Sequence, residues 1–258
     1  MKVPIEIVEG ELGSAQYRIH CEFDSHGDWI QIDTGSTYTA LRFNNHTEAY
    51  TAFGSKTRLS ASGKPRSSDM IEIAKFKVGS ITKLKFPVVR YESGSLEAAR
   101  LGMDWFDASS LTFDLAAQPP SLFSGPEASD GNILHNYNGG TFGIDVTIGG
   151  NVVEALWDTG AELTVVDRDF IMSNGSFFEF EQKIENGQDA AGNSVEFDLY
   201  RVTNLEIGSI KFSGKIMSMD FGMISEKVGQ NIKVVLGTNF MRGYIWQFDF
   251  SGRKWKIS

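Results

Sequence analysis

The hydrophobic and polar positions along the chain follow the pattern of β-strands. Apolar and polar residues alternate from Ile5 to Val8, and several later runs are rich in β-branched and aromatic residues. Both features are typical of strands with a buried face. The pattern predicts strands over 17–23, 29–32, 39–43, 70–78, 84–91, 111–115 and 142–148. Short helices are predicted at 45–53, which begins with an Asn and ends before Gly54, and at 101–106.

One tripeptide occurs twice, each time directly after a strand-like run and before another. Asp33-Thr34-Gly35 and Asp158-Thr159-Gly160 lie 125 positions apart. A single Asp-Thr-Gly is ordinary turn chemistry. Two copies in matching context, half a chain apart, indicate an internal duplication.

Further landmarks recur in the same order. The offset grows from 125 to 129 and then 135 residues, a drift that loop insertions explain. The landmark pairs are 61–63 with 190–192, 78–81 with 207–210, 101–102 with 236–237, and 113–114 with 248–249. We therefore predict two homologous all-β lobes, 1–118 and 139–258, joined by a linker over 119–138 that is rich in Pro, Ser and Gly.

Composition narrows the possible partners and compartments. The 258 residues carry a net charge of −9, which argues against a nucleic-acid or anionic membrane surface. Cys21 is the only cysteine, so no internal disulfide can form. The N-terminus lacks the apolar core of a signal peptide, and no run has the length of a membrane span. A cytoplasmic protein is expected from the sequence as written, and a periplasmic or secreted one if the chain is a trimmed mature form.

The duplication has a chemical consequence. Equivalent residues near a pseudo-twofold axis approach each other, so Asp33 and Asp158 are expected to meet. Two carboxylates so close cannot both be ionised cheaply, and the pair then shares one proton and one water. Gly35 and Gly160 allow tight turns beneath the carboxylates, to which their N–H groups can donate hydrogen bonds. The four histidines show no metal spacing, and we expect neither metal nor cofactor.

These motifs resemble those of the aspartic proteases. The segment from Asp158 to Val165 resembles retroviral proteases more than the second lobe of pepsin, and Asp33-Thr34-Gly35-Ser36 resembles either branch. Val235-Leu236-Gly237 resembles the apolar-apolar-Gly element that braces the active-site loop of that family. The resemblance implies two retropepsin-like β-barrel lobes on a pseudo-twofold axis, with an active-site cleft between them.

The resemblance also implies roles for individual residues. Asp33 and Asp158 would be catalytic, and Thr34 and Thr159 would lock the two loops together. Ser36 would donate a hydrogen bond to its neighbouring carboxylate. Ala161 stands at the matching place in lobe two and has no hydroxyl group.

Losing the hydrogen bond at Ala161 is expected to raise the upper apparent pKa of the pair. Activity would then extend toward mildly acidic or neutral pH. Substrate-binding flaps are expected near Ser62-Gly63 and Ala191-Gly192, with one flap or two left open. Arg100 departs from the pattern, because it precedes Leu101-Gly102 where the family has an apolar residue.

The function expected from these features is that of an aspartic endopeptidase. Such an enzyme would bind an extended segment of a peptide or protein substrate as an added strand. A single chain with two lobes needs no dimer for catalysis, so a monomer is expected. The alternative is a peptide-binding module on the same fold that no longer cleaves. A third possibility is an unrelated β protein in which the two Asp-Thr-Gly turns lie far apart.

Overall fold

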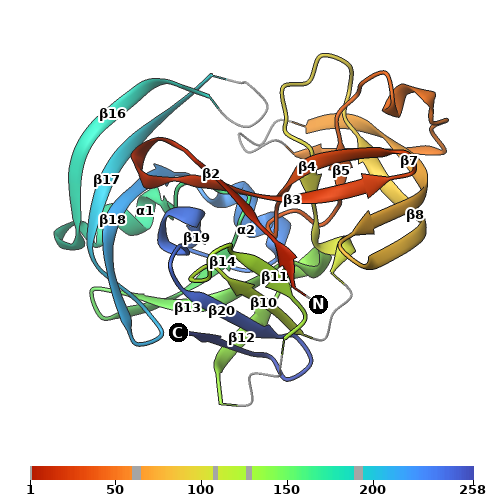
Figure 1. Ribbon diagram of the computed structural model, residues 1–258. Coiled ribbons are helices and arrows are strands. Elements are labelled where there is room, and N and C mark those ends of the chain that lie inside the picture. Colours follow the sequence, from red (N-terminus) through yellow and green to blue (C-terminus); the bar gives the residue numbers. More distant parts are fainter. Residues whose placement is uncertain (1, 60–64, 107–109, 126–129, 189–193) are drawn as a thin grey trace.

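Two β-sheets account for most of the protein (Figure 1). The computed structural model describes residues 2–59, 65–106, 110–125, 130–188 and 194–258. The sheets form two lobes that lie side by side, with a further group of strands beneath both of them in this view. The all-β architecture predicted from the hydrophobic pattern is confirmed.

Lobe one is an eight-stranded sheet in the order β2-β3-β4-β9-β5-β8-β7-β6. Because β7 also pairs with β3, the strands from β3 to β7 in this order close into a barrel. Its strands are β2 (Glu6–Glu9), β3 (Ala15–Phe23), β4 (His26–Ile32), β5 (Ala40–Leu41), β6 (Gly54–Leu59), β7 (Pro65–Val78), β8 (Ile81–Arg90) and β9 (Arg100–Leu101).

Lobe two repeats this plan with strands β13 to β19. Here β17 pairs with β13 and closes a second barrel. Its strands are β13 (Phe142–Ile148), β14 (Asn151–Trp157), β15 (Val165–Asp167), β16 (Phe178–Gln188), β17 (Ser194–Ile207), β18 (Ile210–Met219) and β19 (Val234–Leu236).

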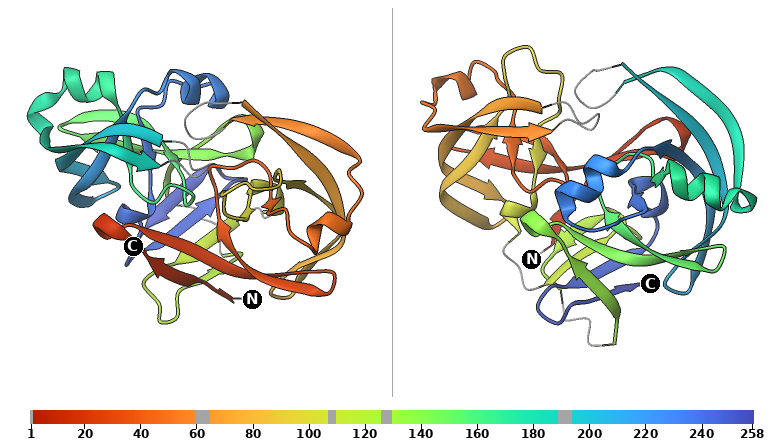
Figure 2. Two further views of the ribbon diagram at one scale, coloured as in Figure 1. Left: turned by 90° about the horizontal axis from the view of Figure 1, so that it is seen from above. Right: turned by 180° about the vertical axis from the view of Figure 1, so that it is seen from behind.

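A third group of strands, which we call the shared sheet, comes from both halves of the chain. Its order is β1-β11-β10-β20-β21-β12, and it continues into lobe two through β13 (Figure 2). Its strands are β1 (Val3–Pro4), β10 (Ser110–Asp114), β11 (Ser121–Phe123), β12 (Asn132–Asn136), β20 (Ile245–Asp249) and β21 (Lys254–Ile257). The stretch expected as a linker, 119–138, therefore contributes β11 and β12.

The shared sheet packs beneath lobe two through aromatic side chains. Trp157, at the end of β14, is fully buried. Its ring lies 4.8 Å from the ring of Phe113 on β10 and 4.7 Å from the ring of Phe248 on β20, measured between centroids. Residues from both halves of the chain thus support the strand that leads to Asp158.

The two lobes match each other residue by residue around their Asp-Thr-Gly loops. Thr39 in lobe one donates from its backbone N–H and its hydroxyl to the carboxylate of Asp104. Thr164 in lobe two makes the same pair of bonds to the side chain of Asn239. The duplication predicted from the sequence is therefore visible in the hydrogen bonds as well as in the strands.

Helices are few and short. Among the described residues, the α-helices are α1 (Arg168–Ser173) and α2 (Gly222–Val228), and the 3-10 turns are η1 (Glu11–Gly13), η2 (Thr47–Ala49), η3 (Met103–Trp105), η4 (Asn138–Gly140), η5 (Gly175–Phe177) and η6 (Thr238–Phe240). In the described parts of the chain, no helix is long and apolar enough to cross a membrane.

The helix predicted over 45–53 is wrong, because the structure has only the turn η2 there. The side-chain oxygen of Asn44 accepts from the backbone N–H of Thr47 at 2.9 Å, and the hydroxyl of Thr47 donates to the carbonyl of Arg42 at 2.6 Å. Such local bonds from side chains to the backbone compete with a regular helix.

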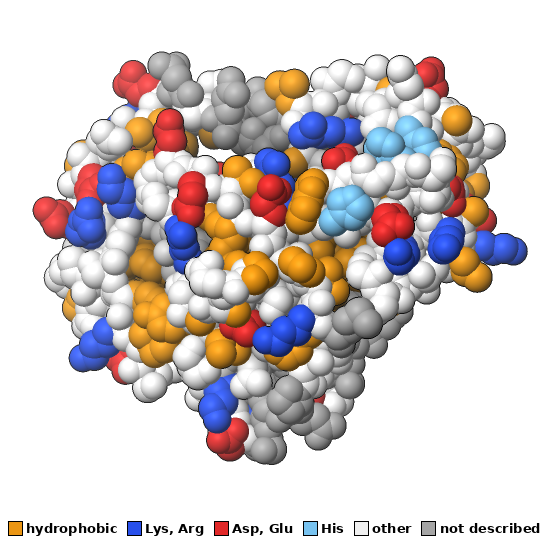
Figure 3. All heavy atoms as spheres, viewed as in Figure 1, with side chains coloured by type: hydrophobic (Ala, Val, Ile, Leu, Met, Phe, Trp, Pro, Cys, Tyr) orange, Lys and Arg blue, Asp and Glu red, His pale blue; other side chains and the backbone are white. Residues whose placement is uncertain are grey.

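The surface charge is mixed rather than divided into patches of one sign. On the face in Figure 3, Lys and Arg side chains lie among Asp and Glu side chains over both lobes. This face offers no continuous basic strip of the kind that binds a nucleic-acid backbone.

Candidate active site

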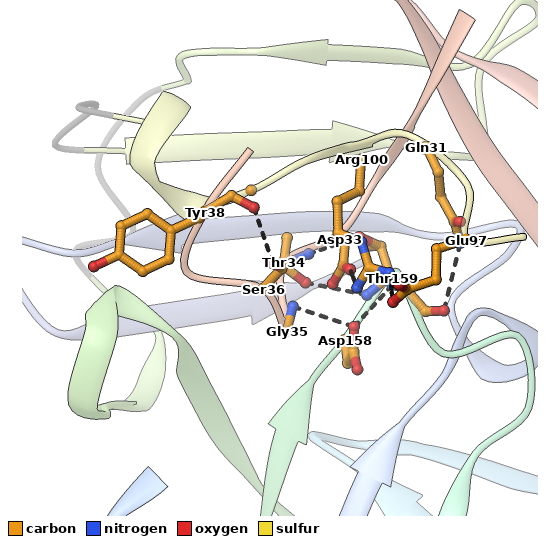
Figure 4. Close-up of polar contacts among 12 residues, drawn as sticks. Gln31, Asp33, Thr34, Gly35, Ser36, Tyr38, Glu97, Arg100, Asp158 and Thr159 are labelled. Carbon is orange, nitrogen blue, oxygen red and sulfur yellow. Dashed lines mark hydrogen bonds and ion pairs between the residues drawn. The ribbon is translucent and has the colours of Figure 1, made fainter. Parts of the chain in front are cut away.

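The two Asp-Thr-Gly loops meet where the barrels face each other (Figure 4). The first loop follows β4 and the second follows β14. The backbone of each aspartate is held by a short strand of its own lobe, β9 in lobe one and β19 in lobe two. The backbone N–H of Asp33 donates to the carbonyl of Leu101, and that of Asp158 donates to the carbonyl of Leu236, both at 3.0 Å.

Thr34 and Thr159 bind the two loops to each other. The backbone N–H of each threonine donates to the hydroxyl oxygen of the other, at 3.2 and 3.1 Å. Each hydroxyl in turn donates at 2.8 Å to a carbonyl of the opposite lobe, that of Trp157 or Ile32. Both threonines are fully buried, so these four bonds form without competition from water.

The carboxyl groups lie above the glycines of these loops. Gly35 and Gly160 both donate from their backbone N–H to Oδ1 of Asp158, at 3.1 and 2.8 Å. A Cβ atom placed on Gly160 would lie 2.5 Å from Oδ1 of Asp33 and 3.0 Å from Oδ1 of Asp158. The two carboxylates therefore flank one position that only a glycine can occupy. Asp33 is buried and Asp158 is partly exposed.

The residues expected in the flaps lie outside the described residues. These are Ser62 and Gly63 in lobe one and Ala191 and Gly192 in lobe two. The hairpin strands that lead to them are described in both lobes. The last described pair is Leu59 with Pro65 in the first hairpin and Gln188 with Ser194 in the second.

The described residues contain no group of three or more His, Cys, Asp or Glu side chains placed to hold a metal ion. The carboxylates at this site are instead hydrogen-bonded to backbone N–H groups and to a guanidinium.

Comparison with known proteins agrees with this fold. Residues 144–240 match the family model described as aspartyl protease. The whole chain superposes on the crystal structure of an aspartic proteinase from Irpex lacteus with a TM-score of 0.61 and 13% sequence identity, covering 100% of this chain and 96% of that chain. The comparison with curated proteins found no match.

The chain has the fold of an aspartic protease. The Asp-Thr-Gly loops of this aspartic protease fold occupy its centre, where the two lobes meet. The resemblance that the sequence motifs indicated is confirmed at the level of the fold.

One hydrogen bond expected for an aspartic protease is made differently here. The hydroxyl of Ser36 donates to the carbonyl of Tyr38 at 3.0 Å, and its single proton is therefore not available to Asp33. The ring of Tyr38 points away from the aspartates in Figure 4 and lies 3.7 Å from Nζ of Lys56 on β6. The role that the resemblance implied for Ser36 is wrong, because the loop satisfies this hydroxyl locally.

Arg100 takes the place at Asp33 that was expected for Ser36. Its Nη1 lies 3.0 Å from Oδ2 of Asp33, and its Nη2 lies 3.3 Å from Oε1 of Glu97. Sequence reasoning found Arg100 only as a departure from the aspartic protease pattern and did not place it in the active site. That departure was the available signal, since a cation in a brace of apolar residues requires a buried partner.

The surroundings of the two loops change the pKa of Asp158. Burial in the surrounding protein and the nearby charge of Asp33 raise the pKa of Asp158 from 3.8 to about 7. Hydrogen bonds from Gly160 and Gly35 and the charge of Arg100 oppose this rise but do not cancel it. Asp158 therefore holds a proton in mildly acidic solution.

Proposed function

We propose that this protein is an aspartic endopeptidase, with Asp33 and Asp158 as its catalytic residues. The observation that carries the proposal is the meeting of two Asp-Thr-Gly loops from different barrels, with both carboxyl groups beside Gly160. A pair of acids held in this way can divide two tasks, because one keeps a proton while the other is ionised.

The reaction uses one water and this pair of acids. The ionised carboxylate removes a proton from the water, whose oxygen then forms a bond to the carbonyl carbon of the peptide. The protonated acid gives its proton to the carbonyl oxygen. The tetrahedral intermediate collapses as the amide nitrogen takes up the proton from the first carboxyl group, and the C–N bond breaks. One hydroxyl of the intermediate returns its proton to the second carboxylate as the carboxylic acid product forms. One proton again remains on the pair.

The substrate is a peptide in extended form. The parts of the loops that can meet it include Gly35, Ser36, Asp158, Gly160 and Ala161, all of which are partly exposed. The flanking hairpins β6–β7 and β16–β17 provide strands to which an extended chain can add by backbone hydrogen bonds. Recognition of this kind depends mainly on the peptide backbone and less on the side chains.

The test is cleavage of a peptide library by the full chain between pH 3 and pH 8, with and without pepstatin. Asp33→Asn and Asp158→Asn are expected to abolish cleavage while leaving the protein folded. Asp169→Asn is the matched control, because Asp169 is an exposed residue on α1. Cleavage that persists in both active-site variants would assign the reaction to other residues.

The same experiment separates the alternative of a peptide-binding module. A wild-type chain that retains peptides but cleaves none of them, at any pH in this range, would favour binding without hydrolysis. Release of new peptide ends by the wild type alone would support the endopeptidase.

A further inference from the structure

The two halves of the active site differ in polarity although their backbones match. In lobe one, Arg100 of β9 lies opposite Gln31 of β4. In lobe two, the equivalent strands place Val235 opposite Leu156. Two apolar side chains next to one aspartate thus correspond to two polar side chains next to the other.

The apolar pair of lobe two belongs to a buried cluster. Leu156 and Val235 pack with Phe221 and with Val228 of α2, and Ala161 of the second active-site loop packs against the same group. Apolar surroundings withhold from a carboxylate the solvation that its charged form requires. This side of the pair of aspartates, which we call the dyad, therefore favours an aspartate that keeps its proton.

The polar side of lobe one is built around a cation. The guanidinium of Arg100 contacts Asp33 through Nη1 and the buried carboxylate of Glu97 through Nη2, at 3.0 and 3.3 Å. The ring of Tyr91 lies 5.5 Å from its Cζ atom. Figure 4 shows Arg100 on one side of Asp33 and Asp158 on the other.

The contact with Arg100 also fixes how Asp33 is oriented. Arg100 binds Oδ2 of Asp33, and Oδ1 of the same side chain is the oxygen beside Gly160. One oxygen of Asp33 is thus occupied by the cation, and the other faces the shared position of the dyad. Gln31 extends this polar side, since its Nε2 donates to the carbonyl of Gly160 at 3.4 Å.

We propose that Arg100 is a positioning residue that makes the dyad asymmetric before substrate arrives: it keeps Asp33 ionised as the general base and leaves the proton on Asp158 as the general acid. This assignment rests on the proposed endopeptidase function. In the reaction, Asp33 takes the proton of the attacking water, and Asp158 gives its proton to the peptide carbonyl oxygen.

The backbone hydrogen bonds from Gly35 and Gly160 favour the charged form of Asp158, so the burial of this group and the charge of Asp33 must outweigh them for the proton to stay. Both backbone donors bind its Oδ1, and no described residue donates a hydrogen bond to its Oδ2. That oxygen is therefore a place for the proton. The charges that act on Asp158 are those of Asp33 and Arg100. Glu97 and Tyr91 are the further titratable groups that act on Arg100 itself.

Three variants and one matched control test the assignment. Arg100→Met removes the charge, Arg100→Val installs the residue that stands at the equivalent place in lobe two, and Arg100→Lys keeps a charge. Arg242→Met is the control, because Arg242 makes a similar contact with Glu9 on the exposed surface. The first readout is the pH dependence of kcat/KM.

Because a cation lowers the pH at which neighbouring carboxylates ionise, its removal is expected to move the acidic limb of the profile up by about one pH unit or more. This movement is expected in Arg100→Met and Arg100→Val, smaller in Arg100→Lys, and absent in Arg242→Met. A loss of activity through misfolding alone would lower kcat/KM without moving the limb. Profiles of Arg100→Met and wild type that coincide would overturn the proposal.

The second readout does not require cleavage. The carboxyl carbons of ¹³C-labelled Asp33 and Asp158 report their ionisation directly by NMR in the wild-type protein. We expect Asp158 to be still protonated at pH 5, and an Asp158 that is already ionised at this pH while the pair holds its proton elsewhere would overturn the assignment. A wild-type chain that cleaves nothing yet titrates in the expected order would refute the endopeptidase and leave the role of Arg100 standing.

Discussion

Replacing Asp158 with asparagine is expected to remove a pH-dependent loss of stability from the folded protein. The pKa of this group rises from 3.8 to about 7 on folding, because of burial and the charge of Asp33. The folded protein thus binds the proton more tightly than the unfolded chain does. The resulting stabilisation is fully present below about pH 4 and is lost as the pH rises through about 7.

The rise of about three pH units sets the size of the effect. At 1.36 kcal/mol for each unit, it corresponds to at most about 4 kcal/mol, and the partial exposure of Asp158 lowers this value. Even half of that amount matters for a protein whose total stability is of the order of 5–15 kcal/mol. In a chain of this size, each kcal/mol corresponds to about 2–4 °C in Tm.

The assay is urea denaturation of wild type, Asp158→Asn and the surface control Asp169→Asn, at half-unit steps from pH 4 to pH 8. The quantity of interest is the difference in the free energy of unfolding between variant and wild type, since titrating groups far from the pair of aspartates cancel in it. We expect this difference to shift in favour of Asp158→Asn as the pH rises and to stay flat for Asp169→Asn. A flat difference for Asp158→Asn would refute the assigned rise in pKa.

Three further predictions concern the loops. Thr34→Val or Thr159→Val leaves a buried N–H and a buried carbonyl without their partner, which we expect to lower the free energy of unfolding by about 2–5 kcal/mol. Thr34→Ser and Thr159→Ser keep the hydroxyl and are expected to lower it much less. Urea titrations measure the free energy of unfolding of both kinds of variant. Gly35→Ala or Gly160→Ala places a Cβ atom within 2.6 Å of a carboxyl group, so the rate of peptide cleavage is expected to fall at least about 100-fold. Gly175→Ala is the control, because its new Cβ atom would have no atom within 4 Å, and this variant is expected to cleave at the normal rate. The cleavage rate of the wild type is expected to stay high up to about pH 7 and to decline above it, so a pH–rate profile confined below about pH 3 would contradict the electrostatics of the site.

The parts of the fold that the sequence predicts are those with a local signal. Strand β13 begins and ends where the pattern places it, at Phe142 and Ile148, because its alternation is regular and its ends are marked by turns. The Asp-Thr-Gly loops and the Leu-Gly braces were found because each occurs twice. Duplication turns a weak motif into a strong one, since two copies must agree in order and spacing.

Pairings between distant segments gave no such signal. Strand β10 pairs with β20, with Phe113 opposite Trp246, and neither segment has a sequence pattern that indicates this pairing. The Pro, Ser and Gly content of 119–138 indicated a linker and concealed β11 and β12. Composition describes the flexibility of an isolated chain, whereas these short strands are held by the neighbours with which they pair.

Side-chain partners in the site were equally hard to foresee. The motif indicated a hydrogen bond from Ser36 to Asp33, but the hydroxyl of Ser36 donates to the carbonyl of Tyr38. Arg100, 67 positions away from Asp33, binds the carboxylate instead. A hydroxyl group turns to whichever acceptor is nearest, and that depends on the folded loop. Arg100 could be recognised as out of place in an apolar brace, but no motif indicated which acid it would meet.

The interleaving of the shared sheet limits how this molecule can be divided. Strands β1, β11 and β10 come from the first half of the chain but share a sheet with β20 and β21 from the second, and β10 pairs directly with β20. A cut made at the repeat boundary would separate Ser110–Asp114 from Ile245–Asp249 and leave open strand edges, which are prone to associate with other chains. Two separately produced halves would therefore have to recombine as complementary fragments, and neither half alone would complete the shared sheet.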